Sequence, residues 1–166
     1  MTSSVQVFVS AGSNIFPQQN MQRACQQIRE IFGSITISSV YRTQSVGFEG
    51  DDFLNLVFCF TTSLDVIEVK RLLDEVEQQA GRARGNNSFM SRTLDLDLLL
   101  YGDHVINGGG VTVPRADILD YAFVLGPMAE LAPDLLHPLE GKSMDELWQQ
   151  SDFPDQEIER LTDIEL

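Results

Sequence analysis

Residues 53–62, FLNLVFCFTT, constrain the fold more than any other segment, because they predict a strand with apolar side chains on both faces. Alternation along a strand divides the segment into two sets. One face carries Phe53, Asn55, Val57 and Cys59, and the other carries Leu54, Leu56, Phe58 and Phe60. A strand that is apolar on both faces is typical of the interior of a sheet. We therefore expect this segment to be a central strand.

The segments around it predict two helices and three further strands. The first strand runs from Val5 to Gly12, and Pro17 then begins a helix that ends at Gly33. A second strand covers roughly residues 35–41, and after the central strand a capping-box pattern at Asp65 and Glu68 begins a helix that ends at Gly81. TLDLDLLLY, residues 93–101, is the last strand. The order β-α-β-β-α-β predicts a ferredoxin-like α+β sandwich.

The remaining third of the chain predicts helical additions to this sandwich. Residues 121–131 have a helical pattern, and Ser143 with Glu146 forms a second capping box. The acidic end, DQEIERLTDIEL, is interpreted as a last, loosely held helix. We expect one domain over residues 1–166, with about 150–166 forming a loosely packed acidic tail.

Composition excludes several functional classes. A net charge of −14 argues against a nucleic-acid partner, which normally requires a basic surface. The chain has no apolar run long enough to cross a bilayer, and its first ten residues lack a basic segment followed by an apolar one. These observations predict a cytoplasmic protein without a membrane partner. Cys25 and Cys59 fall in helix and strand patterns and are interpreted as buried thiols.

Two aspartates interrupt the apolar pattern of the last strand, although Asp is disfavoured in strands. Asp95 and Asp97 are two residues apart, so they project from one face with about 6.6 Å between their Cα atoms. Leu94, Leu96, Leu98 and Leu100 are expected on the opposite face. Two carboxylates in this arrangement can share or flank hard cations. The alternative is a solvated strand face, because the same alternation occurs in half-exposed strands.

Nearby arginines favour the cation site. Arg92 comes three residues before Asp95, and Arg82 and Arg84 begin the adjoining loop, RARGNNSFMS. A polyphosphate bound to metal needs carboxylates for the metal and guanidinium groups for the remaining phosphate oxygens. A loop rich in Gly, Asn and Ser could close over such a substrate. The alternative is a solvated loop with surface ion pairs.

A few polar and aromatic residues allow both a ligand-binding and a structural interpretation. Asn55 is polar on an apolar strand and must find partners, either in a heterocycle or in the backbone. Phe53 and Phe123 could stack on a flat ring or simply pack in the core. Gly12-Ser13-Asn14 is either a strand-to-helix turn or a backbone site for a ligand. His104 and His137 are assigned no role.

Several motifs, taken together and in order, resemble those of a known family. They are Tyr41-Arg42-Thr43, Phe53-Leu54-Asn55, Gly81-Arg82-Ala83-Arg84, Arg92-Thr93-Leu94-Asp95-Leu96-Asp97, and Val113-Pro114 with Phe123-Val124-Leu125. The chain resembles the 6-hydroxymethyl-7,8-dihydropterin pyrophosphokinases of folate biosynthesis from about Val5 to Pro138. That family has a ferredoxin-like α+β fold and transfers pyrophosphate from ATP to the pterin hydroxymethyl group, giving the pterin diphosphate and AMP.

The resemblance implies roles for individual residues. Asp95 and Asp97 would coordinate two Mg²⁺ ions bound with ATP, and Arg82 and Arg92 would act with them in catalysis. The implied ATP site comprises Glu77, Arg84, Arg92, Leu98, Thr112 and Arg115. The implied pterin site comprises Thr43, Val46, Phe53, Asn55 and Phe123. The expected partners are therefore these two small molecules, and the protein is expected to be a monomer.

The chain departs from the family pattern mainly on the ATP side. Ser88 and Phe89 replace a basic residue and a Trp, Gly110 and Tyr121 replace basic residues, and Arg115 stands where a His is common. The loss of phosphate-facing cations leaves a second hypothesis, a non-catalytic relative that binds a pterin or nucleotide as a regulatory or partner module. A third is a two-metal phosphotransferase acting on another alcohol. Asn55, Phe53 and Phe123 favour the pterin.

Overall fold

A computed structural model of the chain describes residues 3–44, 52–82 and 94–166, except for the side chain of Arg82. Within these ranges six strands form one antiparallel sheet, in the order β5-β1-β4-β3-β8 with β2 also paired to β4. The strands are β1 (Val5–Ser13), β2 (Thr36–Ile37), β3 (Val40–Thr43), β4 (Phe53–Thr62), β5 (Asp95–Tyr101) and β8 (Glu159–Leu161).

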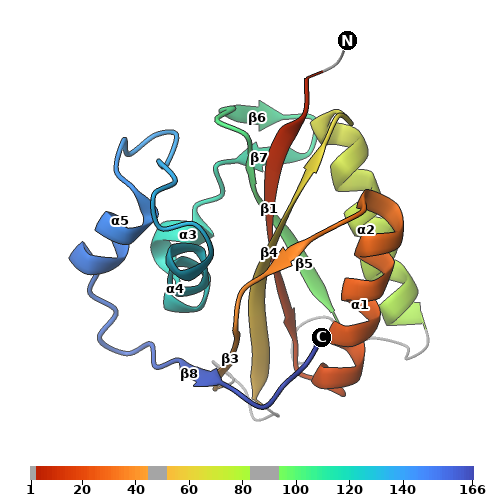
Figure 1. The fold of residues 1–166 in the computed structure, drawn as a ribbon, viewed down its shortest axis with the longest axis horizontal. Helices are drawn as coiled ribbons and strands as arrows, with labels where there is room; N and C mark the ends of the chain where they lie inside the picture. The colour runs from red at the N-terminus through yellow and green to blue at the C-terminus, as the bar shows by residue number, and fades with distance from the viewer. Residues whose placement is uncertain (1–2, 45–51, 83–93) are drawn as a thin grey trace.

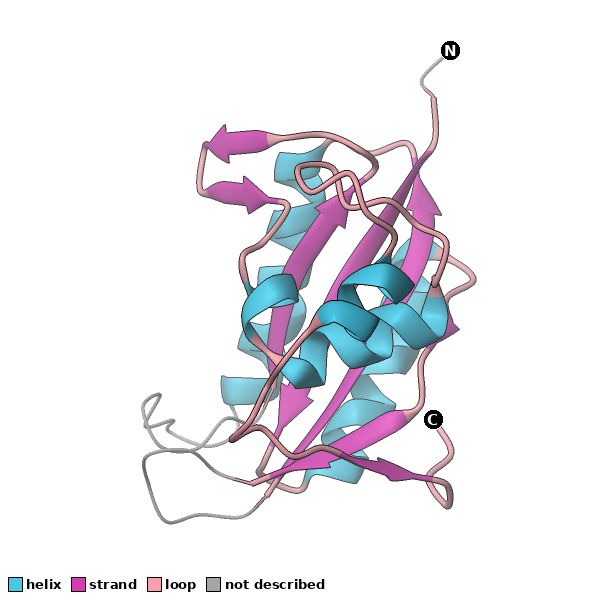
Figure 2. Ribbon diagram, turned by 90° about the vertical axis from the view of Figure 1, so that its left-hand side faces the viewer, coloured by secondary structure: helices cyan, strands magenta, loops and turns pink. Residues whose placement is uncertain are grey.

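Helices cover both faces of this sheet (Figures 1 and 2). One face carries α1 (Pro17–Phe32) and α2 (Val66–Arg82). The other carries α3 (Asp117–Asp120), α4 (Ala122–Leu131) and α5 (Met144–Gln150). The α+β sandwich with C-terminal helical additions is therefore confirmed.

Two apolar clusters fill the space on either side of β4. Leu54, Leu56, Phe58 and Phe60 belong to the cluster that includes buried residues of α1 and α2. Val57 and Cys59 belong to the cluster that includes buried residues of α4 and α5. Because β4 pairs with β1 on one side and with β2 and β3 on the other, the prediction of a central strand is confirmed.

The predicted strand over residues 35–41 is divided into β2 and β3. Ser38 causes the interruption, because its hydroxyl accepts a 2.9 Å hydrogen bond from the amide of Val57 and replaces a backbone acceptor. The backbone amide of the next residue, Ser39, donates a 3.0 Å hydrogen bond to Oε2 of Glu130 in α4. Side chains of the second helical layer therefore fix the course of this segment.

The helix boundaries agree closely with the sequence. Pro17 begins α1, and Gly33, with φ 89°, ends it. α2 extends to Arg82, one residue beyond the predicted end, and the side chain of Asp65 accepts the amide of Glu68 at 2.8 Å. The predicted capping box at Ser143 and Glu146 is present at the start of α5.

A small hairpin between β5 and α3 was not predicted. It consists of β6 (Ile106–Gly108) and β7 (Val111–Val113). Its turn residues, Gly109 and Gly110, have φ values of 63° and 79°, a backbone conformation that suits a tight two-residue hairpin turn. After β7, a cis peptide bond joins Val113 to Pro114.

The prediction of a helix at the C-terminus is wrong, because this segment forms β8 and pairs with the outer edge of β3. An edge strand leaves backbone groups unpaired, and β8 satisfies those of β3. Leu161 of β8, with Ile164 and Leu166 beyond the strand, packs against the first apolar cluster. The segment is acidic, but its apolar side chains pack against the core.

The leucines of β5 also differ from the expected alternation. Leu94, Leu96 and Leu98 lie in the first cluster, whereas Leu99 and Leu100 lie in the second. The cause is a register shift against β1, where Phe8 pairs with Leu100 but Val9 pairs with Leu98. The prediction that Leu100 shares a face with Leu98 is therefore wrong. The bulge comes after the aspartates and leaves their alternation intact.

Three smaller observations complete the fold. No helix in the described ranges is long and apolar enough to cross a membrane. Cys25 and Cys59 are buried free thiols, and burial raises the pKa of Cys25 to about 11. His137 is buried, and its Nδ1 accepts the amides of Leu139 and Glu140, both at 3.1 Å. This histidine holds the loop between α4 and α5.

Candidate active site

Asp95 and Asp97 lie on β5, an edge strand, on the sheet face covered by α3 to α5. Their placement follows from the alternation, because the neighbouring Leu96 and Leu98 pack toward α1 and α2. The Asp97 side chain is 27% exposed, which is less than a solvated strand face would give. Its burial, with the charge of Asp95 close by, raises the pKa of Asp97 to about 6. The strand therefore holds a carboxylate pair at an energetic cost that a bound cation would relieve.

Glu77 adds a third carboxylate from α2. Its Oε2 accepts the backbone amide of Leu96 at 2.8 Å, which fixes it beside the strand that carries the pair. Burial raises the pKa of Glu77 to about 7, with the charge of Asp95 adding to the effect, although the Leu96 amide opposes it. The helix thus places the Glu77 carboxylate close to Asp95.

Arg115 supplies the cation nearest to the pair among the described residues. Its Nη2 lies 3.6 Å from Oδ1 of Asp97, and its Nε lies 3.0 Å from Oδ2 of Asp117. Its backbone amide donates to the carbonyl of Leu99 at 3.0 Å, so the residue is anchored to β5. These contacts place a guanidinium group beside Asp97. Asp117 was not predicted, because nothing in its sequence context marks it.

Gly12 forms the floor between Asp95 and Asn55, where the strand carries no side chain. Asn55 of β4 pairs with Gly12 of β1, which pairs in turn with Asp95 of β5, so the three residues form one row across the sheet. A Cβ at Gly12 would lie 3.2 Å from Oδ1 of Asn55. The row spans two strand spacings, about 10 Å, with no side chain at its centre. The sequence singled out Gly12 as part of a turn, but it lies within β1, where a glycine often marks the close approach of a ligand or backbone.

The predicted pterin residues Thr43, Phe53 and Asn55 are brought together at the end of β3 and β4. Thr43 pairs with Phe53 across the two strands. Asn55 is 6% exposed, and its Nδ2 donates to Oγ1 of Thr43 at 2.9 Å and to the carbonyl of Tyr41 at 3.4 Å. Its donors therefore find protein partners, while its Oδ1 lies over the floor at Gly12.

Phe123 reaches the second apolar cluster from the first turn of α4. Its ring stacks on Tyr121, with centroids 5.0 Å apart and 24° between the planes. Tyr121, which stands where the family commonly has a basic residue, thus extends an aromatic surface. The core-packing interpretation of Phe123 is confirmed, and stacking on a ligand stays a prediction for a side chain that is only partly buried.

The remaining predicted residues differ in how far the structure describes them. Val46, Arg84 and Arg92 lie outside the described residues, as do Ser88 and Phe89, and the side chain of Arg82 is not described. Leu98 is buried in the first cluster, so a nucleotide could reach only its backbone. The hydroxyl of Thr112, on the exposed face of β7, donates to Oδ1 of Asn107 at 3.3 Å.

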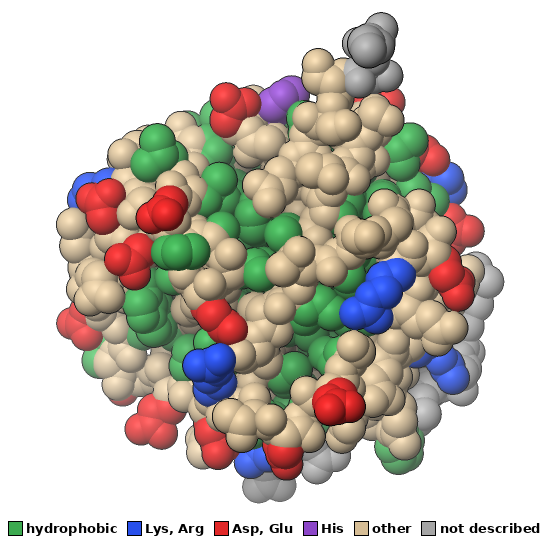
Figure 3. Space-filling model, in the orientation of Figure 1, with side chains coloured by type: hydrophobic (Ala, Val, Ile, Leu, Met, Phe, Trp, Pro, Cys, Tyr) green, Lys and Arg blue, Asp and Glu red, His purple; other side chains and the backbone are tan. Residues whose placement is uncertain are grey.

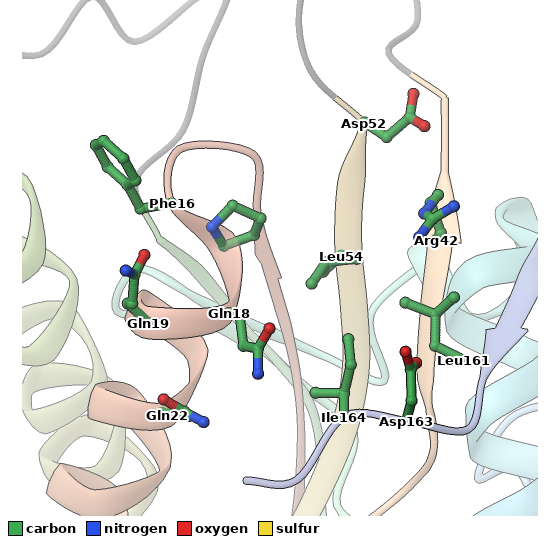
Figure 4. A pocket seen from close by; sticks show the side chains of 11 residues that line it. Phe16, Gln18, Gln19, Gln22, Arg42, Asp52, Leu54, Leu161, Asp163 and Ile164 are labelled. Atoms are coloured by element: carbon green, nitrogen blue, oxygen red, sulfur yellow. The ribbon is translucent and has the colours of Figure 1, made fainter.

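A hollow of about 700 Å³ lies elsewhere, on the other face of the sheet (Figure 4). Glutamines of α1 line one side and Arg42, Leu54 and Ile164 line the other. The Leu54 side chain lies on the opposite face of the sheet from Asn55, so this hollow is separate from Asp95 and Asp97. On the face shown in Figure 3, acidic side chains are spread around the rim and the visible basic side chains are isolated from one another.

Comparison with known proteins agrees with this geometry. Residues 8–133, more than half of the chain, match the model of the 7,8-dihydro-6-hydroxymethylpterin-pyrophosphokinase (HPPK) family. The chain belongs to this family. It is therefore an enzyme of the diphosphotransferase class, and the resemblance seen in the sequence is confirmed.

Individual relatives support the assignment. The chain is 35% identical over 147 residues to the 2-amino-4-hydroxy-6-hydroxymethyldihydropteridine pyrophosphokinase of Synechocystis sp., covering 87% of this chain and 75% of that protein. It is 33% identical over 159 residues to the enzyme of the same name from Pseudomonas aeruginosa, covering 93% and 96%. Each of these alignments covers more than four fifths of this chain.

A solved structure shares the fold. The crystal structure of Plasmodium falciparum HPPK-DHPS superimposes with a TM-score of 0.71 over 90% of this chain. The identity is 11%, so this likeness concerns the fold alone. The chain spans about two fifths of that longer protein, 42% of its length.

Proposed function

We propose that this HPPK-family chain transfers pyrophosphate from ATP to the hydroxymethyl group of 6-hydroxymethyl-7,8-dihydropterin, a step of folate biosynthesis that yields AMP. The observation that carries the proposal is the row Asn55–Gly12–Asp95, which places the buried amide of Asn55 and the carboxylate of Asp95 two strands apart on one face of the sheet. A two-ring heterocycle with a short alcohol arm is proposed to lie over Gly12, between Asn55 and Asp95.

Asp95 and Asp97 are proposed to hold two Mg²⁺ ions. No group of three or more His, Cys, Asp or Glu side chains forms a metal cluster in the described part of the chain. That suits Mg²⁺, which takes one or two carboxylates and completes its shell with water and substrate phosphates. When bound with ATP, the ions would neutralise the phosphate charge that develops during transfer.

The chain's own residues bind and orient the two substrates. Arg115 is held by Asp117 beside the carboxylates, where its guanidinium can take a phosphate oxygen by charge-assisted hydrogen bonds. Glu77 braces the strand through Leu96. Arg82, Arg84 and Arg92 are proposed to act on the phosphates from the loop after α2, with Leu98 and Thr112 near the nucleotide.

The pterin is proposed to lie against Thr43, Phe53, Asn55 and Phe123, with Val46 adding to the pocket. The Oδ1 of Asn55 faces the floor and can accept a hydrogen bond from the ring. This orientation directs the hydroxymethyl oxygen toward the β-phosphorus. The new O–P bond forms as the bond to the α-phosphate oxygen breaks, AMP leaves and the alcohol proton is released. Alignment and charge neutralisation supply most of the rate.

The biological setting is proposed on the same basis. We infer one domain over residues 1–166 that acts as a monomer in the cytoplasm on small molecules, without a nucleic-acid or membrane partner. The net charge of −14 and the spread of acidic side chains support this inference.

The test is to incubate the protein with 6-hydroxymethyl-7,8-dihydropterin, ATP and Mg²⁺ and to follow AMP by chromatography. Formation of AMP and pterin diphosphate that depends on both substrates and on Mg²⁺ is expected. Measurable pterin binding without AMP would refute the proposed activity and would favour a non-catalytic relative, as would follow from the missing basic residues at positions 88, 110 and 121.

A further inference from the structure

Residues 156–160, which lead into and include the start of β8, lie along α4 and are called the C-terminal strap. Three alternate residues of this strap contact the helix: Gln156, Ile158 and Arg160. Gln156 accepts the amide of Ala122 at 2.9 Å through Oε1 and donates to the carbonyl of Asp120 at 3.0 Å through Nε2. It thereby satisfies one of the unpaired amides at the start of α4, where no side-chain cap from Tyr121 is present.

The middle and the end of the strap continue this contact. A Cβ placed on Gly126 would lie 3.1 Å from Cδ1 of Ile158, so the strap touches the helix at the position of this glycine. Nη2 of Arg160 lies 3.8 Å from Oε2 of Glu130. In Figure 1 the blue chain leaves α5 and passes beneath α4 to reach β8.

The spacing of these contacts explains why an extended chain can follow the helix. Positions 122, 126 and 130 are four residues apart and lie along one side of α4, with a rise of about 6.0 Å per step. Positions 156, 158 and 160 are two residues apart in an extended chain, with a rise of about 6.6 Å per step. The two rises nearly match, so three successive contacts can form in register.

Glu130 connects the far end of α4 to β3. Its Oε1 accepts the hydroxyl of Tyr41 at 2.7 Å, and its Oε2 accepts the amide and the hydroxyl of Ser39 at 3.0 and 2.7 Å. Nε of Arg160 also donates to the Ser39 hydroxyl at 2.8 Å. One carboxylate therefore joins the helix, the strand and the strap.

These contacts fix the helix at both ends relative to the pocket. Phe123 follows Ala122 directly and precedes Glu130 by seven residues, or two turns, so Phe123 and Glu130 lie on the same side of α4. Tyr41, which Glu130 holds, pairs with Asn55 and accepts one of its hydrogen bonds. The distance between Phe123 and the row that contains Asn55 is thus set by Gln156 at one end and by Glu130 at the other.

We propose that Gln156 and Glu130 are positioning residues for the pterin, which act by holding Phe123 of α4 at a fixed distance from Asn55 and Thr43. This inference rests on the proposed function, since it assumes that the pterin occupies the space between α4 and the ends of β3 and β4. In the nucleotide half of the site, the ion pairs of Arg115 are with Asp97 and Asp117 rather than with the strap, so this half is expected to be insensitive to the strap.

The test compares the affinities of the two substrates in matched variants. Isothermal titration measures a non-hydrolysable ATP analogue with Mg²⁺, and then 6-hydroxymethyl-7,8-dihydropterin added to the protein saturated with that analogue. Gln156→Ala and Glu130→Ala are expected to weaken pterin binding roughly three- to tenfold, the effect of one or two net hydrogen bonds, and to leave the analogue within about twofold. Glu130→Gln keeps an acceptor oxygen for Tyr41 and is expected to restore part of the affinity.

Glu157→Ala is the control, because Glu157 lies in the strap between Gln156 and Ile158 and is exposed. It is expected to bind both ligands as the wild type does. Unchanged pterin affinity in Gln156→Ala and Glu130→Ala, or equal weakening of both ligands, would overturn the inference alone. A wild-type protein that binds the nucleotide analogue but no pterin would overturn the proposed function and this inference with it.

Discussion

Asp97→Asn should make the metal-free protein more stable while removing most of its activity. The Asp97 side chain is 27% exposed and lies beside Asp95, with Arg115 as a partial counter-ion at 3.6 Å. An amide has nearly the same shape but carries no charge, so it avoids the burial cost and the repulsion that raise the pKa of this carboxyl. The site would lose a metal ligand and gain folding stability, as is common where function requires an unfavourable arrangement.

The magnitude follows from the pKa. The value rises from 3.8 to about 6, a difference of about two units, and each unit corresponds to about 1.36 kcal/mol. With allowance for partial exposure, Asp97→Asn should raise the free energy of unfolding by about 1–3 kcal/mol at pH 7. Because the folded-state pKa is raised, the carboxyl costs the fold nothing below pH 4, and the cost develops as the pH rises toward 6. The gain should therefore be small at pH 4 and complete above pH 7.

Urea denaturation in EDTA at pH 4, 5, 6 and 7 measures this gain, with Asp103→Asn as the control because Asp103 is exposed. AMP formation measured at pH 7 with Mg²⁺ should fall roughly tenfold to hundredfold, the effect of losing a charged contact. A variant no more stable than the wild type at pH 7, or equally stabilised at every pH, would refute the electrostatic reasoning. A variant with the full rate would refute the assignment of the carboxylate pair.

Three further changes test other parts of the structure. Gly12→Ala should weaken pterin binding about tenfold in a titration, because the new Cβ would lie 3.2 Å from Oδ1 of Asn55; unchanged affinity would show that the floor is not used. His137→Asn keeps a hydrogen-bond acceptor that does not titrate. Because burial lowers the pKa of His137, the melting temperature of the wild type should fall relative to that of the variant as the pH drops below 6.5. Melting temperatures that change in parallel with pH would contradict this. Ser143→Ala removes the capping-box acceptor of α5 and should lower the free energy of unfolding by about 1 kcal/mol in denaturant titrations, whereas no loss would show that the cap is unimportant.

The regular elements of this fold follow from short-range patterns in the sequence. Alternation predicted β1, β4 and β5, and Pro17 with Gly33 predicted both ends of α1, because these patterns act over a few residues. β8 was missed because a three-residue strand has too little alternation to be recognised, and its formation depends on the free edge of β3, more than a hundred residues earlier. The bulge at Leu99 was missed for the same reason, since it depends on how β5 meets β1.

The residues of the candidate site also fall into those that local sequence patterns predict and those that they do not. Asp95, Asp97 and Asn55 could be identified because each is polar in an otherwise apolar strand. Glu130 could not, because its partners Tyr41 and Ser39 are brought to it only by the packing of α4 on the sheet. Asp117 could not, because its importance depends on its neighbour Arg115 reaching Asp97 of β5. The sequence predicted the groups that would contact substrates, whereas the groups that hold them in place became visible only in three dimensions.

The pairing of β8 with β3 also has a consequence for the order of synthesis. Ser39 and Arg160 are separated by 121 positions, so their contact cannot form until Arg160 has left the ribosome. Until then the edge of β3 that carries Tyr41 and Thr43 stays unpaired and open to association with other chains. The pairing of β1 with β5 and the ion pairs of Arg115 with Asp97 and Asp117 use only residues up to position 117. A nascent chain can therefore form these contacts around the carboxylates before it completes the support for Phe123.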